Sequence, residues 1–234
     1  MSAFVLIPGA GGMAWIWSEV VQRLERDGHE AISVDLPADD DSKGLHDYAG
    51  IVVRAIGGRT AHLVAQSLGG FTAPLVAARA PLRMLVLVNA MIPNPGETAG
   101  EWWKNTGAVA AREAAAKANG YGADVDLDTY FLHDVPEETL RKGPSTPRQE
   151  SDAAFREPCR FERWPSIPIH VVASSDDRFF PVEFQRRVAR DRLNAELETL
   201  PGGHLVPLSN PEGLAKLLVR LSLQGAPRAS NAPH

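Results

Sequence analysis

One short stretch constrains this chain more than any other, the run LVAQSLGG at positions 63–70. An apolar run typical of a buried strand, residues 62–65, stops just before Ser67, and residues 68–78 are rich in the small and apolar side chains of a packed helix. A serine at so abrupt a strand-to-helix junction is expected on a tight, strained turn, and the small residues Ala65 and Gly69 let neighbouring backbone pass close by. The pattern A-x-S-x-G therefore predicts a nucleophile elbow, with alanine in place of the usual first glycine. A turn of small residues in which Ser67 caps a helix is the alternative that the motif alone leaves open.

Apolar runs typical of buried strands recur along the chain and alternate with segments typical of helices. The runs lie at residues 4–7, 31–34, 62–65, 84–88, 167–173 and 195–200. This alternation predicts an α/β fold with a mostly parallel sheet of about six strands, right-handed crossovers and helices on both faces. Ligands of such sheets bind outside the carboxyl ends of the strands, and the loop after Ile7 and the turn at Ser67 both fall at that edge.

The pattern changes between residues 92 and 165, where prolines and a tryptophan pair precede an alanine-rich helix at about 108–118 and no clear strand follows. An insertion at the carboxyl edge of a sheet would roof the ligand site. We therefore predict a core of residues 1–91 and 166–223, a helical cap of residues 92–165, and a flexible polar tail at 224–234. A helical excursion packed elsewhere on the protein is the alternative.

Three residue types that together make a nucleophilic catalyst follow three different strands. They are Ser67, then Asp176 or Asp177, and then His204. A serine hydroxyl is a poor nucleophile at neutral pH, so a histidine must remove its proton, and an acid must orient the imidazole and stabilise its charged form. The order serine, acid, histidine, each just past a strand, predicts a catalytic triad at one sheet edge. Taken singly, His204 could be a turn residue and the aspartates a helix cap.

An oxyanion formed at Ser67 also needs hydrogen-bond donors. The backbone N–H of Leu68 is one candidate, and the glycine-rich loop after Ile7 supplies the other, because Gly9, Gly11 and Gly12 allow its backbone close to a ligand. No G-K-[ST] follows that loop, so a phosphate-binding P-loop is not predicted.

Composition excludes several other classes of function. A formal net charge of −5 argues against nucleic acid and anionic membranes as partners, and no apolar stretch approaches membrane-spanning length. The single cysteine, Cys159, cannot form an internal disulfide or a cysteine zinc site by itself. No histidine cluster has metal-ligand spacing, so we expect neither a metal nor a cofactor. The chain begins directly with a strand-like run that no basic segment precedes, which favours a cytoplasmic protein.

Four motifs of this chain resemble those of a known family. Residues 8–17 (PGAGGMAWIW) are similar to its H-G-A-x-x-x-A-W-x-W, and residues 66–70 (QSLGG) to its H-S-L-G-G. Residues 177–185 (DRFFPVEFQ) match D-x-x-x-P-x-x-F-Q, and His204 with residues 208–211 matches the family's terminal H-x-x-x-x-S-x-P. Over most of its length except the middle of the cap, the chain thus resembles the α/β-hydrolases grouped with plant methylesterases and hydroxynitrile lyases.

This resemblance implies the α/β-hydrolase fold and a role for individual residues. It makes Ser67 the nucleophile, His204 the base and Asp177, rather than Asp176, the acid, because only Asp177 has a proline at the right distance. It also makes the N–H groups of Ala10 and Leu68 the oxyanion donors. The residues it places around the substrate pocket are Gly9, Gly11, Gln66, Met91, Trp102, Trp103 and Leu205.

Three departures from the family pattern bear on the reaction. Pro8 and Gln66 replace histidines at the pocket rim, and Leu205 stands where the lyases carry a lysine after the catalytic histidine. Since that lysine would stabilise a departing cyanide, its absence favours a cofactor-independent carboxylesterase that cleaves a small-molecule ester through an acyl-enzyme on Ser67. A hydroxynitrile or C–C lyase, a non-catalytic small-ligand receptor and an acyltransferase remain alternatives, as does a homodimer that pairs through Trp102 and Trp103.

Overall fold

The computed structural model describes residues 2–224, and at its centre lies a six-stranded sheet in which every pair of neighbouring strands is parallel. Along the sheet the order is β2-β1-β3-β4-β5-β6, and in the central register Val5 lies opposite Leu63, which in turn lies opposite Leu85. The predicted parallel sheet is confirmed. The strands are β1 (Ala3–Ile7), β2 (Glu30–Ser33), β3 (Ala61–Gln66), β4 (Leu82–Val88), β5 (Ile169–Ser174) and β6 (Leu197–Leu200).

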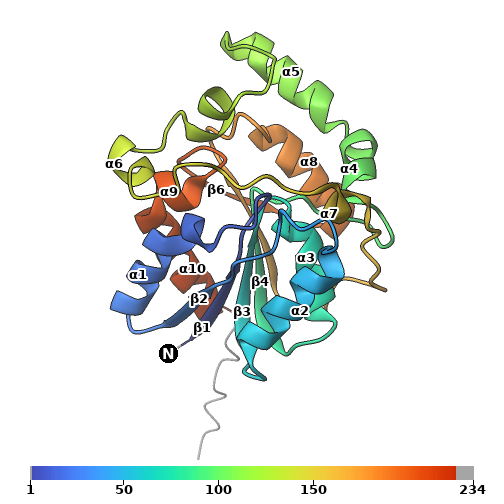
Figure 1. Ribbon diagram of the computed structural model, residues 1–234, viewed down its shortest axis with the longest axis vertical. Coiled ribbons are helices and arrows are strands. Elements are labelled where there is room, and N and C mark those ends of the chain that lie inside the picture. Colours follow the sequence, from blue (N-terminus) through green and yellow to red (C-terminus); the bar gives the residue numbers. More distant parts are fainter. Residues whose placement is uncertain (1, 225–234) are drawn as a thin grey trace, which may run out of the picture.

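Helices cover both faces of the sheet (Figure 1) because the buried strands are apolar on both sides. On one face, α1 (Ser18–Arg26) and α10 (Pro211–Gln224) pack over Phe4 and Leu6. The alternate strand residues, such as Val5 and Ile7, face α2 (Leu45–Ile56), α3 (Gly69–Ala77) and α8 (Val182–Leu193). Along each central strand, neighbouring residues therefore contribute to two different hydrophobic cores.

Residues 92–165 lie between β4 and β5 and form a separate group of short helices beyond the carboxyl ends of the strands (Figure 1). The helix predicted at 108–118 is α5 (Ala108–Asn119), but α4 (Ala99–Thr106) was not predicted, although Thr98 and Glu101 cap its first turn reciprocally. The remaining cap elements are the π-helix η2 (Asp128–Leu132), α6 (Glu137–Leu140) and α7 (Asp152–Arg156).

Some predicted boundaries shift. The helix expected from residue 15 begins as a 3-10 turn, η1 (Ala14–Trp17), and an unpredicted short helix, α9 (Val206–Ser209), follows His204. Gln224 belongs to α10, and the rest of the predicted tail, residues 225–234, lies outside the described residues. Between residues 2 and 224, no helix has the length and apolar character needed to cross a membrane.

A buried ion pair ties the start of the cap to α8. The guanidinium of Arg192 contacts both carboxylate oxygens of Glu97, with Nη2 3.0 Å from Oε1, and the two side chains are only 8% and 4% exposed. Burial alone would raise the pKa of Glu97, but the bonds from Arg192, Asn105 and the Asn94 N–H lower it below its ordinary value. The carboxylate is therefore held in its charged form beneath the cap.

Candidate active site

Ser67 occupies the turn between β3, which ends at Gln66, and α3, which begins at Gly69. Its φ of +50° lies in the left-handed region, which costs a non-glycine residue about 1–3 kcal/mol. The surrounding backbone holds the turn in place, because Ser67 N–H donates to the Val88 carbonyl (3.2 Å), and the Ser67 carbonyl accepts from Gly70 N–H and Met91 N–H (3.0 Å each). The strained turn expected from A-x-S-x-G is therefore present, and it is anchored to the end of β4.

Close backbone packing around this turn explains two of its glycines. A Cβ on Gly70 would collide with the Met91 carbonyl, and a Cβ on Gly9 would lie 2.5 Å from Gln66 Oε1 and 2.8 Å from Ser67 Cβ. Gly9 thus lies against the back of the turn rather than in the cavity. Its predicted place in the substrate pocket is wrong.

The structure brings Ser67, His204 and Asp177 together through a chain of two hydrogen bonds. His204 Nε2 lies 3.0 Å from Ser67 Oγ, and His204 Nδ1 lies 2.9 Å from Asp177 Oδ2. Asp177 Oδ1 accepts the N–H groups of Phe179 (2.9 Å) and Phe180 (2.8 Å), which fix the carboxylate. Asp176 is exposed, whereas Asp177 is 4% exposed and His204 is 1% exposed. Of the two aspartates that the residue pattern allowed, only Asp177 reaches the histidine.

Three phenylalanines enclose the imidazole of His204. The ring centroids of Phe131, Phe179 and Phe180 lie 5.3, 5.1 and 5.1 Å from that of His204, each in an edge-on arrangement. Phe131 comes from the cap, and the other two come from the loop that carries Asp177. An apolar enclosure of this kind excludes water and strengthens the hydrogen bonds within it.

Asn89, which sequence reasoning missed, organises the loops behind the triad. Its Oδ1 accepts Ser174 N–H (2.8 Å), and its Nδ2 donates to the carbonyls of His204 (3.0 Å) and Gly203 (3.2 Å). Gln185 adds a bond from Nε2 to Asp177 Oδ2 (3.2 Å). A polar residue directly after a buried strand, at the same edge as Ser67, was the signal that could have identified Asn89.

The two predicted oxyanion donors lie beside Ser67. Ala10 and Leu68 both line the same cavity as Ser67, and in the described part of the chain neither backbone N–H donates to another protein group. The neighbouring Gly11 N–H is engaged, because it donates to Glu150 Oε2 (2.8 Å). The N–H of Ala10, unlike that of Gly11, is therefore available to an oxyanion.

The cavity over Ser67 has a volume of about 480 Å³ and is lined mainly by apolar side chains from the core and the cap. Five of the predicted pocket residues line it: Gly11, Gln66, Met91, Trp103 and Leu205. Residues not predicted include Met13, Trp15, Phe131, Arg148, Glu150 and Phe155. Most of these come from the cap, whose fold the sequence pattern did not define.

Trp102 does not line the cavity, so its predicted pocket role is wrong. Its side chain is fully buried, and its indole N–H donates to the Ile92 carbonyl (3.0 Å). The adjacent Trp103 turns toward the cavity because successive helical residues point about 100° apart. Full burial also removes Trp102 from any surface through which two copies could pair.

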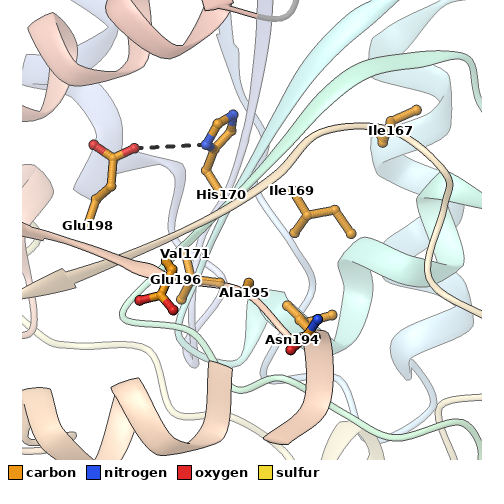
Figure 2. Close-up of a pocket in the computed structure, with 9 residues that line it drawn as sticks. Ile167, Ile169, His170, Val171, Asn194, Ala195, Glu196 and Glu198 are labelled. Carbon is orange, nitrogen blue, oxygen red and sulfur yellow. Dashed lines mark ion pairs between the residues drawn. The ribbon is translucent and has the colours of Figure 1, made fainter. Parts of the chain in front are cut away.

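A second cavity, of about 450 Å³, lies near the amino-terminal end of β5 (Figure 2), and no residue of the triad lines it. His170 Nδ1 and Glu198 Oε1 lie 3.9 Å apart in it, and burial lowers the pKa of His170. No serine, threonine or cysteine lines this cavity, and no residue lines both cavities.

Cys159 is buried, and its thiol donates to the Phe71 carbonyl (3.1 Å). Burial raises the pKa of this thiol to about 12, so it is not a second nucleophile. Between residues 2 and 224, no three His, Cys, Asp or Glu side chains gather in a way that would hold a metal ion.

Comparison with known proteins agrees with this fold. The sequence model described as the Alpha/beta hydrolase family matches residues 4–217. Among solved structures, polyneuridine aldehyde esterase is similar with 20% identity and a TM-score of 0.74, over 95% of this chain and 99% of that one. A pyrethroid hydrolase from Sphingobium faniae is 20% identical with a TM-score of 0.75, over 94% and 97% of the two chains. A methylesterase from Arabidopsis is 18% identical with a TM-score of 0.75, over 96% and 100%. No protein with a curated description is detectably similar in sequence.

Proposed function

Because the chain belongs to the alpha/beta hydrolase family, we propose that it is a serine carboxylesterase that cleaves a small carboxylic ester. One observation carries the proposal: the hydrogen-bonded series Ser67–His204–Asp177 opens into a largely apolar cavity. A volume of about 480 Å³ suits a small organic molecule. Similar folds in proteins described as esterases and as a pyrethroid hydrolase support ester cleavage.

In the first half of the proposed reaction, Ser67 Oγ attacks the acyl carbon while His204 Nε2 takes the hydroxyl proton. The carboxylate of Asp177 holds the imidazole tautomer and stabilises the imidazolium. The negative oxygen of the tetrahedral intermediate accepts hydrogen bonds from the N–H groups of Ala10 and Leu68. His204 then gives its proton to the leaving alcohol, and the acyl group remains on Ser67.

In the second half, water enters the site and His204 removes one of its protons as the oxygen attacks the acyl carbon. The second tetrahedral intermediate uses the same two N–H donors and collapses when His204 returns a proton to Ser67 Oγ. The carboxylic acid leaves, and the enzyme regains its starting protonation state. The reaction consumes one water and needs no cofactor.

Hydrolysis of p-nitrophenyl esters of increasing acyl length, with and without Ser67→Ala, tests the proposal. Loss of the nucleophile is expected to lower kcat by about ten-thousand-fold or more. Ser175→Ala is the matched control, because Ser175 is an exposed serine in the loop that carries Asp177. This control is expected to leave kcat unchanged.

Mandelonitrile is included in the same panel. Release of cyanide without ester turnover would show a lyase rather than an esterase. Turnover that is equal in the wild-type protein and in Ser67→Ala would contradict covalent catalysis by this serine. Circular dichroism of each variant shows that the comparison is between folded proteins.

A further inference from the structure

Glu150 is an acidic residue of the cap that lines the same cavity as Ser67. Two groups from the core hold its carboxylate: Gly11 N–H donates to Oε2 (2.8 Å), and the Tyr48 hydroxyl donates to Oε1 (2.6 Å). These bonds join parts of the chain that are 139 and 102 residues apart in sequence. The carboxylate is therefore placed by the tertiary structure, next to the loop that carries the Ala10 N–H.

No side chain between residues 2 and 224 forms an ion pair with Glu150, although the charge of Arg148 acts on it from a distance. The nearby Arg148 also lines the cavity, but its guanidinium is directed to the Leu36 carbonyl (2.7 Å) and to Asp35 (3.0 Å). Burial raises the pKa of Glu150, while the bonds from Tyr48 and Gly11 and the charge of Arg148 favour its ionised form and offset part of this rise. A carboxylate of this kind gains most from a positive charge brought into the cavity.

We propose that Glu150 forms a subsite for a protonated amine carried by the ester substrate. This proposal rests on the esterase function and names its substrate class: a small apolar ester that bears one basic nitrogen. Each oxygen of an ionised carboxylate has two acceptor positions, and Gly11 and Tyr48 occupy one on each oxygen. An ammonium N–H can use the remaining positions, and in an apolar cavity such a charge-assisted bond is stronger than in water. A substrate carrying a carboxylate is disfavoured by the same charge.

Glu150→Gln removes the charge and can keep both anchoring contacts. The amide oxygen of glutamine can accept from Gly11 N–H, and its NH₂ group can donate to the Tyr48 oxygen, which is also an acceptor. The oxyanion loop therefore keeps its attachment to the cap. Glu196→Gln is the matched control, because Glu196 is an exposed glutamate at the second cavity (Figure 2).

Two pairs of esters with matched shapes test the subsite at pH 8 in a pH-stat. Methyl 4-(dimethylamino)butanoate and methyl 5-methylhexanoate differ in the charge of the acyl group, and 2-(dimethylamino)ethyl acetate and 3-methylbutyl acetate differ in that of the alcohol. We expect the wild-type kcat/KM to be higher for the amine than for the neutral ester in one of the two pairs, the pair whose charged group reaches Glu150. Glu150→Gln is expected to lower this preference by about 10- to 100-fold, which is the range for a hydrogen bond to a charged group. In Glu150→Gln the neutral ester is expected to lose less kcat/KM than its charged partner, and Glu196→Gln is expected to keep the wild-type preference for the amine.

The subsite is overturned if the preference for the amine is the same in Glu150→Gln and the wild-type protein for both pairs. Equal losses on charged and neutral esters would also overturn it, because they would show that Glu150 only anchors the loop. Failure of the esterase proposal gives a different result, since every ester would then be turned over no faster than by Ser67→Ala.

Binding measured without turnover keeps the subsite testable in that case. Trp15 and Trp103 line the cavity, so titration with N,N-dimethylbutylamine hydrochloride can be followed by tryptophan fluorescence. The wild-type protein is expected to bind this amine at least about tenfold more tightly than Glu150→Gln does. Equal affinities would overturn the subsite whatever reaction the protein catalyses.

Discussion

Replacement of Asn89 by aspartate tests whether the loops behind the triad are positioned by this single side chain. Asn89 is fully buried, and its amide orientation is fixed because Oδ1 accepts a backbone N–H from Ser174. Nδ2 therefore faces Ser174 Oγ, 2.8 Å away, and the carbonyl oxygens of Gly203 and His204, 3.2 and 3.0 Å away. In Asn89→Asp, a second carboxylate oxygen takes the place of this NH₂ group and meets two carbonyl acceptors, and of its three neighbours only the Ser174 hydroxyl can donate to it.

The buried aspartate is expected to remain protonated in the native protein well above its unfolded pKa of about 3.9. If the native pKa of this aspartate is raised by about two units, the free energy of unfolding of the variant at pH 7 falls by about 2.7 kcal/mol. The reference is the same variant with an aspartate whose pKa does not change on folding. The sign follows from proton binding: between the two pKa values the native state binds more protons than the unfolded state. Stability relative to wild type therefore falls as pH rises from about 4 to about 6 and then levels off. Movement of the His204 carbonyl is also expected to lower kcat/KM by about 100-fold.

Urea unfolding at pH 4.5 and pH 8 measures this difference. Asn194→Asp is the matched control, because Asn194 also has a φ of +50°, close to the +45° of Asn89, but is exposed. Between pH 4.5 and pH 8, the free energy of unfolding of this control is expected to change by almost the same amount as that of the wild-type protein. The reasoning is refuted if Asn89→Asp and Asn194→Asp lose the same stability at both pH values, or if Asn89→Asp keeps wild-type kcat/KM.

Two other contacts lead to further predictions. Arg192→Met leaves the Glu97 carboxylate buried without its cation and is expected to cost about 3–5 kcal/mol in urea unfolding at pH 7; a cost below about 1 kcal/mol would contradict a contributing ion pair. Because the native pKa of Glu97 is lowered, the stabilisation is present above the unfolded pKa of about 4.3 and is lost as pH falls below it, so the cost of Arg192→Met is expected to shrink in acid. Phe131→Ala admits water beside His204 and is expected to lower kcat/KM for a neutral ester about tenfold in steady-state kinetics, with unchanged kinetics as the contrary result.

The residues that sequence reasoning placed best follow buried strands. Ser67, the Asp176–Asp177 pair and His204 each come just after an apolar run, and parallel topology alone brings such positions to one edge of the sheet. The choice of Asp177 came from a family resemblance. Its physical reason is a turn that aims the Phe179 and Phe180 N–H groups at one carboxylate oxygen, a local geometry that two adjacent aspartates do not reveal in sequence.

The contacts that were missed depend on the path of the cap. Glu150 meets Tyr48 and Gly11 across more than 100 residues, and no periodicity links them. The error at Trp102 has the same origin, because the neighbouring tryptophans of α4 were predicted as a pair, while their positions on the helix send one into the core and the other into the cavity. The positions of the strands follow from the apolar pattern, but the residues that line the cavity depend on how the cap packs on the core, which the local sequence constrains only weakly.

Residues at the end of β4 and just after it contact the segments that carry the candidate triad, although none of them belongs to the triad. The Val88 carbonyl and Met91 N–H hold the strained turn at Ser67, and Asn89 between them binds the His204 carbonyl and the backbone of Ser174, just before the loop of Asp177. Asn89 itself has a φ of +45°, close to the +50° of Ser67. The neighbouring strands β3 and β4 are therefore each followed directly by a residue with left-handed backbone. Because strain of this kind persists only where surrounding contacts enforce it, residues 88–91 help to hold the backbone of both the nucleophile and the base in place. Substitutions there are expected to change kcat more than KM, because they alter the alignment of catalytic groups more than the walls of the cavity.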